Sequence, residues 1–182
     1  MKAYFISGLG CDRRAFQRIV LPSEYEIVHL DWLMPEDNES IEHYSARLAE
    51  PIGITEPFVL VGLSFGGMIA VEISKFKKPH KLFLISSIAT RSSLPALYKV
   101  CGLLHLDKIV PAKWLRYPNI ALYWVFGPLT QETKLLFKGI LFETDPIFLK
   151  WALGVIARWK STQLPEQLIQ IHGRRDRIFN PF

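Results

Sequence analysis

The sequence predicts an α/β protein, with a mostly parallel sheet flanked by helices and a helical segment inserted between two of its strands. Short apolar runs alternate with helical patterns over the first half of the chain. One of these runs leads into a serine that is framed by glycines. The alternation stops after Ser87 and resumes with an apolar run at Leu168.

Five runs rich in β-branched and aromatic residues are the predicted strands. They cover residues 3–7, 26–30, 58–62, 81–87 and 168–172. Because the runs are almost continuously apolar, they are typical of parallel strands that are covered on both faces. Ligands bind such sheets at the carboxyl ends of the strands, where Ser7, Ser64 and Ser87 lie.

Three helices are predicted between these strands. The first covers residues 13–20 and the third residues 65–76, while the second has Ile41, Tyr44, Leu48 and Ile52 at helical spacing. Either Asn38 or Ser40 can cap the second helix, because both side chains accept hydrogen bonds from free backbone amides.

The glycine-framed serine is Ser64, in the run Gly62-Leu63-Ser64-Phe65-Gly66-Gly67. A sharp reversal from strand to helix forces its central residue toward a left-handed backbone, and it needs neighbours without side chains. Such a turn holds the serine hydroxyl clear of the sheet, above the free N–H groups of a helix N-terminus. The alternative is an ordinary glycine-rich turn that carries an incidental serine.

The inserted segment covers residues 91–161 and is helical in pattern, with prolines that interrupt it. It holds four of the five tryptophans: Trp114, Trp124, Trp151 and Trp159. We interpret residues 1–90 and 162–182 as the core of the fold and 91–161 as a helical lid or cap over an apolar pocket. Helix packing explains most of these aromatic residues individually, and a dimerisation surface is the alternative for the whole segment.

Length and composition indicate one folded domain, with 182 residues of which 49% are hydrophobic. No run approaches the ~18 apolar residues of a membrane span, and the apolar start of the chain is too short for a signal peptide. The two cysteines, Cys11 and Cys101, form neither a disulfide framework nor a metal spacing, which favours a reducing cytoplasm. Cys11 is a weak candidate nucleophile, since no basic partner is evident near it.

The net charge of +5 does not indicate a nucleic-acid partner. Ten Lys and Arg residues against four Asp and Glu residues give residues 91–161 a charge of +6, and the rest of the chain sums to −1. These basic residues are spaced through the helical patterns and not clustered, as is typical of solvated helix faces.

Three pieces of the sequence, taken in order, resemble the α/β-hydrolase family. They are the loop Gly8-Leu9-Gly10 after the first strand, the turn from Gly62 to Gly66, and a C-terminal pattern with His172-Gly173, Asp176 and Pro181. Each piece alone is weak, but their ordered combination is specific, and it covers nearly the whole chain. The resemblance implies a hydrolase that uses no metal and no organic cofactor.

The resemblance also implies roles for particular residues. Ser64 would attack a carbonyl carbon, and the backbone N–H groups of Leu9 and Phe65 would hold the oxyanion. Asp176 would orient the catalytic histidine, although a turn aspartate or one paired with the neighbouring arginines is the alternative. Asp145 in the inserted segment is a second candidate for the acid.

The sequence departs from the family because no histidine follows Asp176 before the chain stops at Phe182. Its five histidines, which are His29, His43, His80, His105 and His172, are interpreted as structural or solvated. We expect the chain to be a piece that lacks the last strand and the histidine, since its end would leave a sheet edge uncovered; the alternative is a complete chain without a base. The chain as given should be a very poor catalyst. Ser7 precedes Gly8 where many relatives carry histidine.

We therefore expect a serine hydrolase that cleaves a carboxylic ester or a related acyl substrate with an apolar group, through an acyl-enzyme and a Ser-Asp-His triad. A serine at the turn argues against dehalogenases and epoxide hydrolases, which need a carboxylate there. Thioesters, amides and C–C bonds stay open as targets. The alternative is a non-catalytic ligand-binding or interaction protein on the same scaffold, and a homodimer through the lid is an expected partner arrangement.

Overall fold

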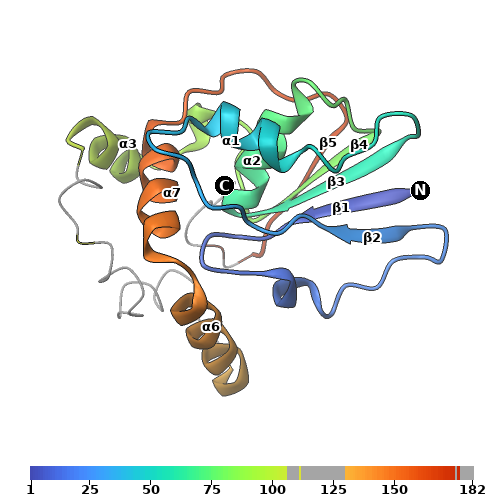
Figure 1. Cartoon of the computed structure of the whole chain (residues 1–182), viewed down its shortest axis with the longest axis horizontal. Helices are drawn as coiled ribbons and strands as arrows, with labels where there is room; N and C mark the ends of the chain where they lie inside the picture. Colours follow the sequence, from blue (N-terminus) through green and yellow to red (C-terminus); the bar gives the residue numbers. More distant parts are fainter. Residues whose placement is uncertain (106–110, 112–129, 175, 177–182) are drawn as a thin grey trace.

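The computed structural model describes residues 1–105, 111, 130–174 and 176 (Figure 1). In chain order its strands, α-helices and 3₁₀ turns (η) are β1 (Lys2–Ile6), η1 (Arg13–Phe16), β2 (Glu26–His29), α1 (Ile41–Leu48), β3 (Phe58–Leu63), α2 (Phe65–Ser74), β4 (Lys81–Ile85), η2 (Arg91–Ser93), α3 (Ala96–Leu103), α6 (Gln131–Glu143), α7 (Pro146–Arg158) and β5 (Leu168–Ile171). The predicted positions of Trp114, Trp124 and Pro181 lie outside the described residues.

The five strands form one sheet in the order β2-β1-β3-β4-β5, and every neighbouring pair is parallel. The register places Phe5 beside Val61, Val61 beside Phe83, and Phe83 beside Ile169. All carboxyl ends therefore meet at one edge of the sheet. The predicted mostly parallel α/β architecture is confirmed.

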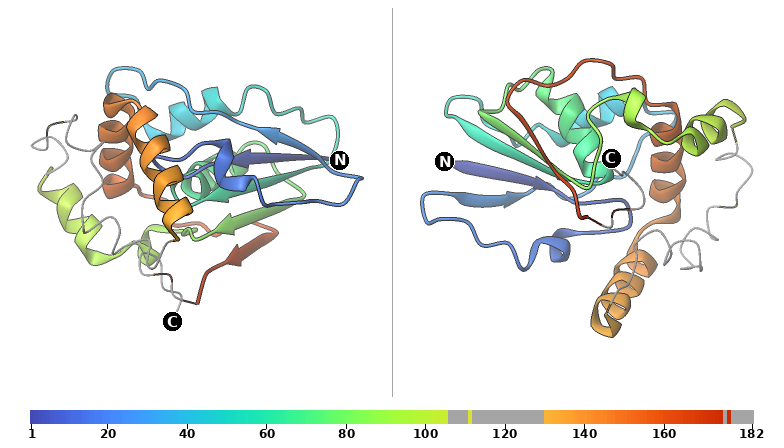
Figure 2. Two further views of the ribbon diagram at one scale, coloured as in Figure 1. Left: turned by 90° about the horizontal axis from the view of Figure 1, so that it is seen from below. Right: turned by 180° about the vertical axis from the view of Figure 1, so that it is seen from behind.

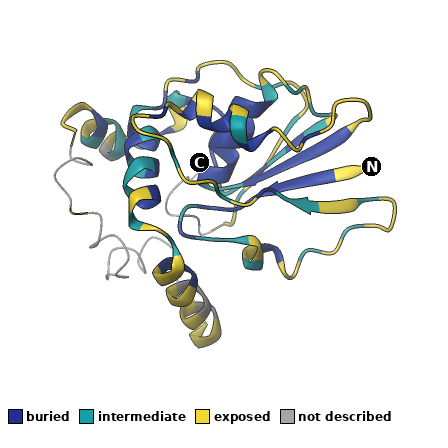
Figure 3. Ribbon diagram, in the orientation of Figure 1, coloured by how far each residue is buried: buried dark blue, intermediate teal, exposed yellow. Residues whose placement is uncertain are grey.

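Helices α1 and α2 cover one face of this sheet (Figures 1 and 3). Every residue of α2 from Phe65 to Ile73 is buried, because the helix lies between α1 and the strands. Ser40 caps α1 by accepting a hydrogen bond from the amide of His43, so the cap is Ser40 and not Asn38. Ile52 lies beyond the end of α1 but is buried in the same core.

The opposite face of the sheet differs from the sequence prediction. Residues 13–20 form a single 3₁₀ turn over Arg13–Phe16 and not a longer helix. Phe16 is the buried residue of that turn, whereas Val20 is 89% exposed. Only Phe16 and, in part, Ile19 pack against the sheet, so a longer helix gains too little packing to form.

The covering of that second face thins out at β4 in the described part of the chain, where Phe83 and Ile85 are partly buried. Phe16 packs with Phe5 and Val61 in a small core on this side. Farther along the sheet, Ile169 and Ile171 of β5 are 37% and 48% exposed. The prediction of strands covered on both faces is therefore right for the centre of the sheet and wrong for β5.

The helices between β4 and β5 lie at the carboxyl edge of the sheet (Figure 1), and α6 points away from it (Figure 2). α3 packs tightly on α7, since a Cβ added to Gly102 would lie 2.4 Å from the carbonyl oxygen of Ala157. Trp159, which follows α7, donates from Nε1 to Oε1 of Glu72 in α2 at 2.7 Å. None of the described helices is long and apolar enough to cross a membrane.

Candidate active site

Ser64 occupies the turn between β3 and α2, as the sequence predicts. Its backbone has φ +51° and ψ −118°, a left-handed conformation that costs a residue with a side chain some strain. Ser64 is the N-cap residue of α2, yet its side chain makes no capping hydrogen bond. The hydroxyl is therefore not used to satisfy the helix and stands at the helix N-terminus, where developing negative charge is favoured.

Two glycines make this turn possible. A Cβ on Gly62 would lie 2.4 Å from Cα of Gly67, and a Cβ on Gly66 would lie 2.2 Å from the carbonyl oxygen of Ser7. Neither approach is open to a residue with a side chain. Gly66 therefore permits direct contact between the start of α2 and the end of β1, which brings the loop after β1 to the side of Ser64.

The loop after β1 is a tight, hydrogen-bonded turn. The amide of Cys11 donates to the carbonyl oxygen of Gly8 at 3.0 Å. The carbonyl oxygen of Cys11 accepts from Oγ of Ser7 at 2.8 Å and from Nε1 of Trp32 at 3.0 Å. A Cβ on Gly8 would lie 3.4 Å from Cβ of Ser64. The backbone of Leu9, the next residue, therefore starts close to Ser64.

Asp176 lies in the turn that follows β5. Its amide donates to the carbonyl oxygen of Gly173 at 2.9 Å, and its Oδ2 is 3.5 Å from Nδ1 of His172. Both side chains are nearly buried, with 7% of Asp176 and 10% of His172 exposed. The structure thus places His172 beside the predicted acid, a contact that the sequence analysis did not anticipate.

His172 is nevertheless separated from Ser64 by one strand. Leu63 pairs with Ile85 and Ile85 pairs with Ile171, so Ser64 and His172 lie at one level of the sheet, two strands apart. Neighbouring strands are ~4.8 Å apart, which makes this backbone separation about 10 Å. No described histidine hydrogen-bonds to the hydroxyl of Ser64.

Three other residues that the sequence offered as candidates, two histidines and an aspartate, have packing, hydrogen-bonding or capping roles in the structure. His29 packs against the rings of Phe5 and Phe16. The amide of His80 donates to the carbonyl oxygen of Phe58, at the end of the sheet opposite Ser64. The carboxylate of Asp145 accepts from the amide of Ile147 and caps α7.

The side chain of Phe65 lies in an aromatic cluster that joins α2 to α7. Its ring stacks on Trp32, with centroids 5.5 Å apart, and contacts Phe148 and Trp151 at 6.5 and 6.0 Å. Phe148 and Trp151 belong to α7, so the inserted segment touches the residue that follows Ser64. Trp32 was missed by the sequence analysis, because a single tryptophan after a strand carries no periodic signal.

A cavity of about 520 Å³ opens beside this cluster, between the loop after β1, the loop after β2 and the helices α6 and α7. Its apolar lining includes Trp32, Leu33, Ile140 and Phe148, and Ser7 borders it on the side of the turn. The volume is within the range of small-molecule sites. Because its walls come from four separate segments, only the tertiary structure reveals it.

Cys11 also lines the cavity, but it is a poor nucleophile there. Burial, and then the nearby charge of Asp12, raise the pKa of the Cys11 thiol from 9.0 to about 12. The thiol is therefore protonated at neutral pH, whereas nucleophilic attack needs the thiolate.

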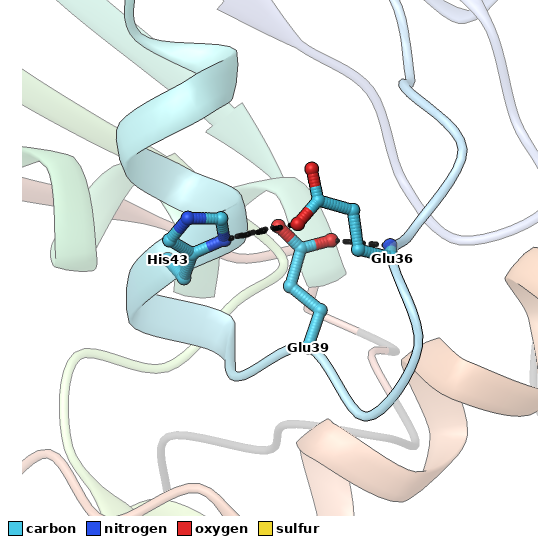
Figure 4. A group of neighbouring side chains, drawn as sticks. All are labelled: Glu36, Glu39 and His43. Carbon is cyan, nitrogen blue, oxygen red and sulfur yellow. Dashed lines mark hydrogen bonds and ion pairs between the residues drawn. The ribbon is translucent and has the colours of Figure 1, made fainter.

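A second polar cluster lies at the start of α1, where Glu36, Glu39 and His43 place possible ligand atoms within 4.8 Å of one another (Figure 4). Oε1 of Glu39 is 2.7 Å from Nδ1 of His43, and Nη1 of Arg47 donates to both oxygens of Glu39 at 2.9 Å. The guanidinium already supplies the positive charge that a metal ion would bring. We therefore interpret this cluster as an anchor for α1.

The comparison with solved structures identifies the fold. No protein-family model matches the chain, and no curated protein matches its sequence. Among solved structures, a putative lipase from Acinetobacter baumannii AYE is 20% identical with a TM-score of 0.70, and the match covers 99% of this chain and 69% of that one. A thermophilic esterase from Thermogutta terrifontis is 18% identical with a TM-score of 0.69, covering 100% and 74%.

A third structure, the meta-cleavage product hydrolase from Pseudomonas fluorescens IP01, is 20% identical with a TM-score of 0.64, and the match covers 99% of this chain and 76% of that one. At these identities the likeness concerns the fold. The chain has the α/β-hydrolase fold.

Proposed function

We propose that this α/β-hydrolase fold carries a serine hydrolase that acts on a carboxylic ester or a related acyl substrate through an acyl-enzyme. The observation that carries the proposal is the left-handed backbone of Ser64, at φ +51°, on a residue whose hydroxyl caps nothing. A non-glycine residue keeps such a conformation when the surrounding structure enforces it, and these positions cluster at functional sites. Gly62 and Gly66, which tolerate no side chain, permit it here, and the hydrogen bonds of the Ser64 amide to Ile85 and of the Gly67 amide to the Ser64 carbonyl oxygen, both at 2.9 Å, hold it.

In the proposed mechanism, Ser64 attacks the substrate carbonyl and the resulting oxyanion is held by two backbone amides. Phe65 supplies one amide, because the first N–H groups of a helix have no partner within the helix. Leu9 supplies the other from the loop beside Ser64. Such donors act most strongly where charge develops in the transition state.

Asp176 is the proposed acid of the triad. It follows β5, and its side chain is nearly buried. The acid of a catalytic triad is buried in this way, because it orients the imidazole through a direct hydrogen bond. A base must complete the set, since a serine hydroxyl reacts with an ester when a base accepts its proton. The order serine, acid, histidine in the family that the sequence resembles places this base after Asp176.

The proposed substrate has an apolar acyl or alcohol group. Phe65, Phe148 and Trp151 pack together beside Ser64, and Phe65 and Phe148 are buried in that cluster. The adjoining cavity has an apolar part, with Trp32, Leu33 and Ile140, and a charged part that includes Arg13, Asp31 and Glu143. The segment 91–161 acts as a cap in this proposal, since its helices α6 and α7 supply part of the cavity lining. These contacts support an apolar group, and they do not distinguish esters from thioesters.

Fluorophosphonate labelling of the protein as the cell makes it tests the proposal. We expect covalent labelling of a single serine, lost in Ser64→Ala and retained in Ser92→Ala, which removes an exposed hydroxyl from η2. Peptide mass spectrometry identifies the labelled residue. If the protein binds apolar esters but is not labelled, the proposed hydrolase is wrong and a non-catalytic binding protein is favoured instead.

A further inference from the structure

The peptide unit between Ser64 and Phe65 contains two groups that matter for the proposed mechanism. Its N–H, on Phe65, is a proposed oxyanion donor, and its carbonyl oxygen belongs to the strained Ser64. A trans peptide is planar, with its N–H and C=O pointing in opposite directions. Whatever fixes the direction of the Ser64 carbonyl therefore also fixes the direction of the Phe65 N–H.

Two donors fix that carbonyl. The amide of Gly67 donates to the oxygen of Ser64 at 2.9 Å, as the first turn of α2 requires. Oγ of Ser87 donates to the same oxygen at 2.6 Å. Ser87 is not part of this helix: it follows β4, the next strand of the sheet, and it is fully buried.

The hydroxyl of Ser87 is confined to this position. A Cβ built on Gly67 would lie 2.3 Å from its Oγ, so the absence of a side chain at Gly67 makes the space that Ser87 fills. The backbone of Ser87 is held from the other side, where Nε2 of Gln170 in β5 donates to its carbonyl oxygen at 3.3 Å. The preceding residue is held by β5 as well, since the amide of Ser86 donates to the carbonyl oxygen of Ile171 at 2.8 Å.

We propose that Ser87 is a positioning residue, which holds the Ser64–Phe65 peptide so that the Phe65 N–H faces the developing oxyanion. This inference rests on the proposed function, and it adds a residue that the sequence resemblance does not name. Because Ser87 is connected to β5, it also ties the serine turn to the strand that leads to Asp176. Its contribution is made in the transition state, where the oxyanion exists, and not in substrate binding.

Steady-state hydrolysis of a chromogenic ester by Ser87→Ala tests this role. We expect kcat to fall about tenfold with KM changed less than twofold, since a misdirected donor loses part of the 10²–10³-fold effect of an oxyanion donor. The matched control is Ser45→Ala. Ser45 is also fully buried, but its hydroxyl has no hydrogen-bond partner in the described structure, so kcat should not change. An equal kcat in Ser87→Ala and wild type would overturn the proposal.

Amide hydrogen exchange supplies a readout that does not depend on activity. Ser87→Ala should speed exchange of the Gly67 N–H about tenfold, because the oxygen that accepts its hydrogen bond is no longer fixed, whereas Ser45→Ala should leave it unchanged. If the natural protein hydrolyses no ester and Ser64 is not labelled, the proposed function fails. The exchange rate then still decides whether Ser87 holds the turn, and an unchanged rate at Gly67 refutes it.

Discussion

Replacing Trp159 by phenylalanine probes how the inserted helices are joined to the helix that carries Ser64. Trp159 is 1% exposed, and its indole N–H donates to the carboxylate of Glu72 at 2.7 Å. That carboxylate is itself buried and is also bound by Nζ of Lys75 at 2.6 Å. Trp159→Phe removes the indole donor and leaves a small void, while Glu72 keeps its lysine partner.

The cost follows from two contributions. A hydrogen bond to a charged group contributes about 2 kcal/mol to stability. The void left by exchanging an indole for a phenyl ring adds about 1 kcal/mol. We therefore expect Trp159→Phe to lower the free energy of unfolding by about 3 kcal/mol, a large part of the ~5–15 kcal/mol that holds a domain folded.

Equilibrium unfolding in urea measures this loss, and Trp151→Phe is the matched control. Trp151 also donates one hydrogen bond, at 2.8 Å, but to the uncharged carbonyl oxygen of Glu39. Its side chain is only partly buried, so we expect a loss of about 1.5 kcal/mol. If Trp159→Phe costs no more than Trp151→Phe, the bond to the buried carboxylate does not join the two parts of the fold as described.

Three further predictions concern single ionisable groups. Asp176→Asn in the natural protein should lower ester turnover by about 10⁴-fold, with an unchanged circular dichroism spectrum; unchanged turnover would move the acid elsewhere. Burial acts to raise the pKa of Glu39, but hydrogen bonds from the Glu36 amide, Arg47 and His43 outweigh it and lower the pKa from 4.5, so its stabilisation is present at neutral pH and is lost as the pH falls below that value. Glu39→Gln should remove that part of the acid dependence in urea titrations between pH 6 and about 3. Cys11, with its pKa raised to about 12, should resist iodoacetamide at pH about 8, and rapid alkylation detected by mass spectrometry would contradict the raised pKa.

The elements of the sheet were predictable because their signals are local. The apolar runs gave each strand to within two residues of its observed ends, and the turn at Ser64 follows from glycines at fixed spacing. The helix predicted over residues 13–20 was wrong for a reason that is not local. The sequence shows which residues of this segment are apolar. Whether Val20 finds a surface to pack against depends on the rest of the fold, and in the structure it is exposed.

The candidate site divides in the same way. Ser64 was predicted from a short pattern, and Asp176 and Leu9 were predicted from the family resemblance that such patterns carry; their roles stay predictions. The contact between His172 and Asp176, the stacking of Trp32 on Phe65, and the cavity beside them join residues from separate segments. No pattern within one segment indicates such contacts.

The sequence by itself determined the alternation of strands and helices and the sharp turn at Ser64 with the glycines that permit it, because these features depend mainly on residues close together along the chain. Only the tertiary structure decided which groups surround that turn. The hydroxyl of Ser87 reaches the Ser64 carbonyl across 23 residues of sequence, and it does so because parallel pairing sets β4 beside β3. Hydrogen bonds act over about 3 Å of space whatever the distance along the chain, so the partners of a site residue are known once the strands are packed.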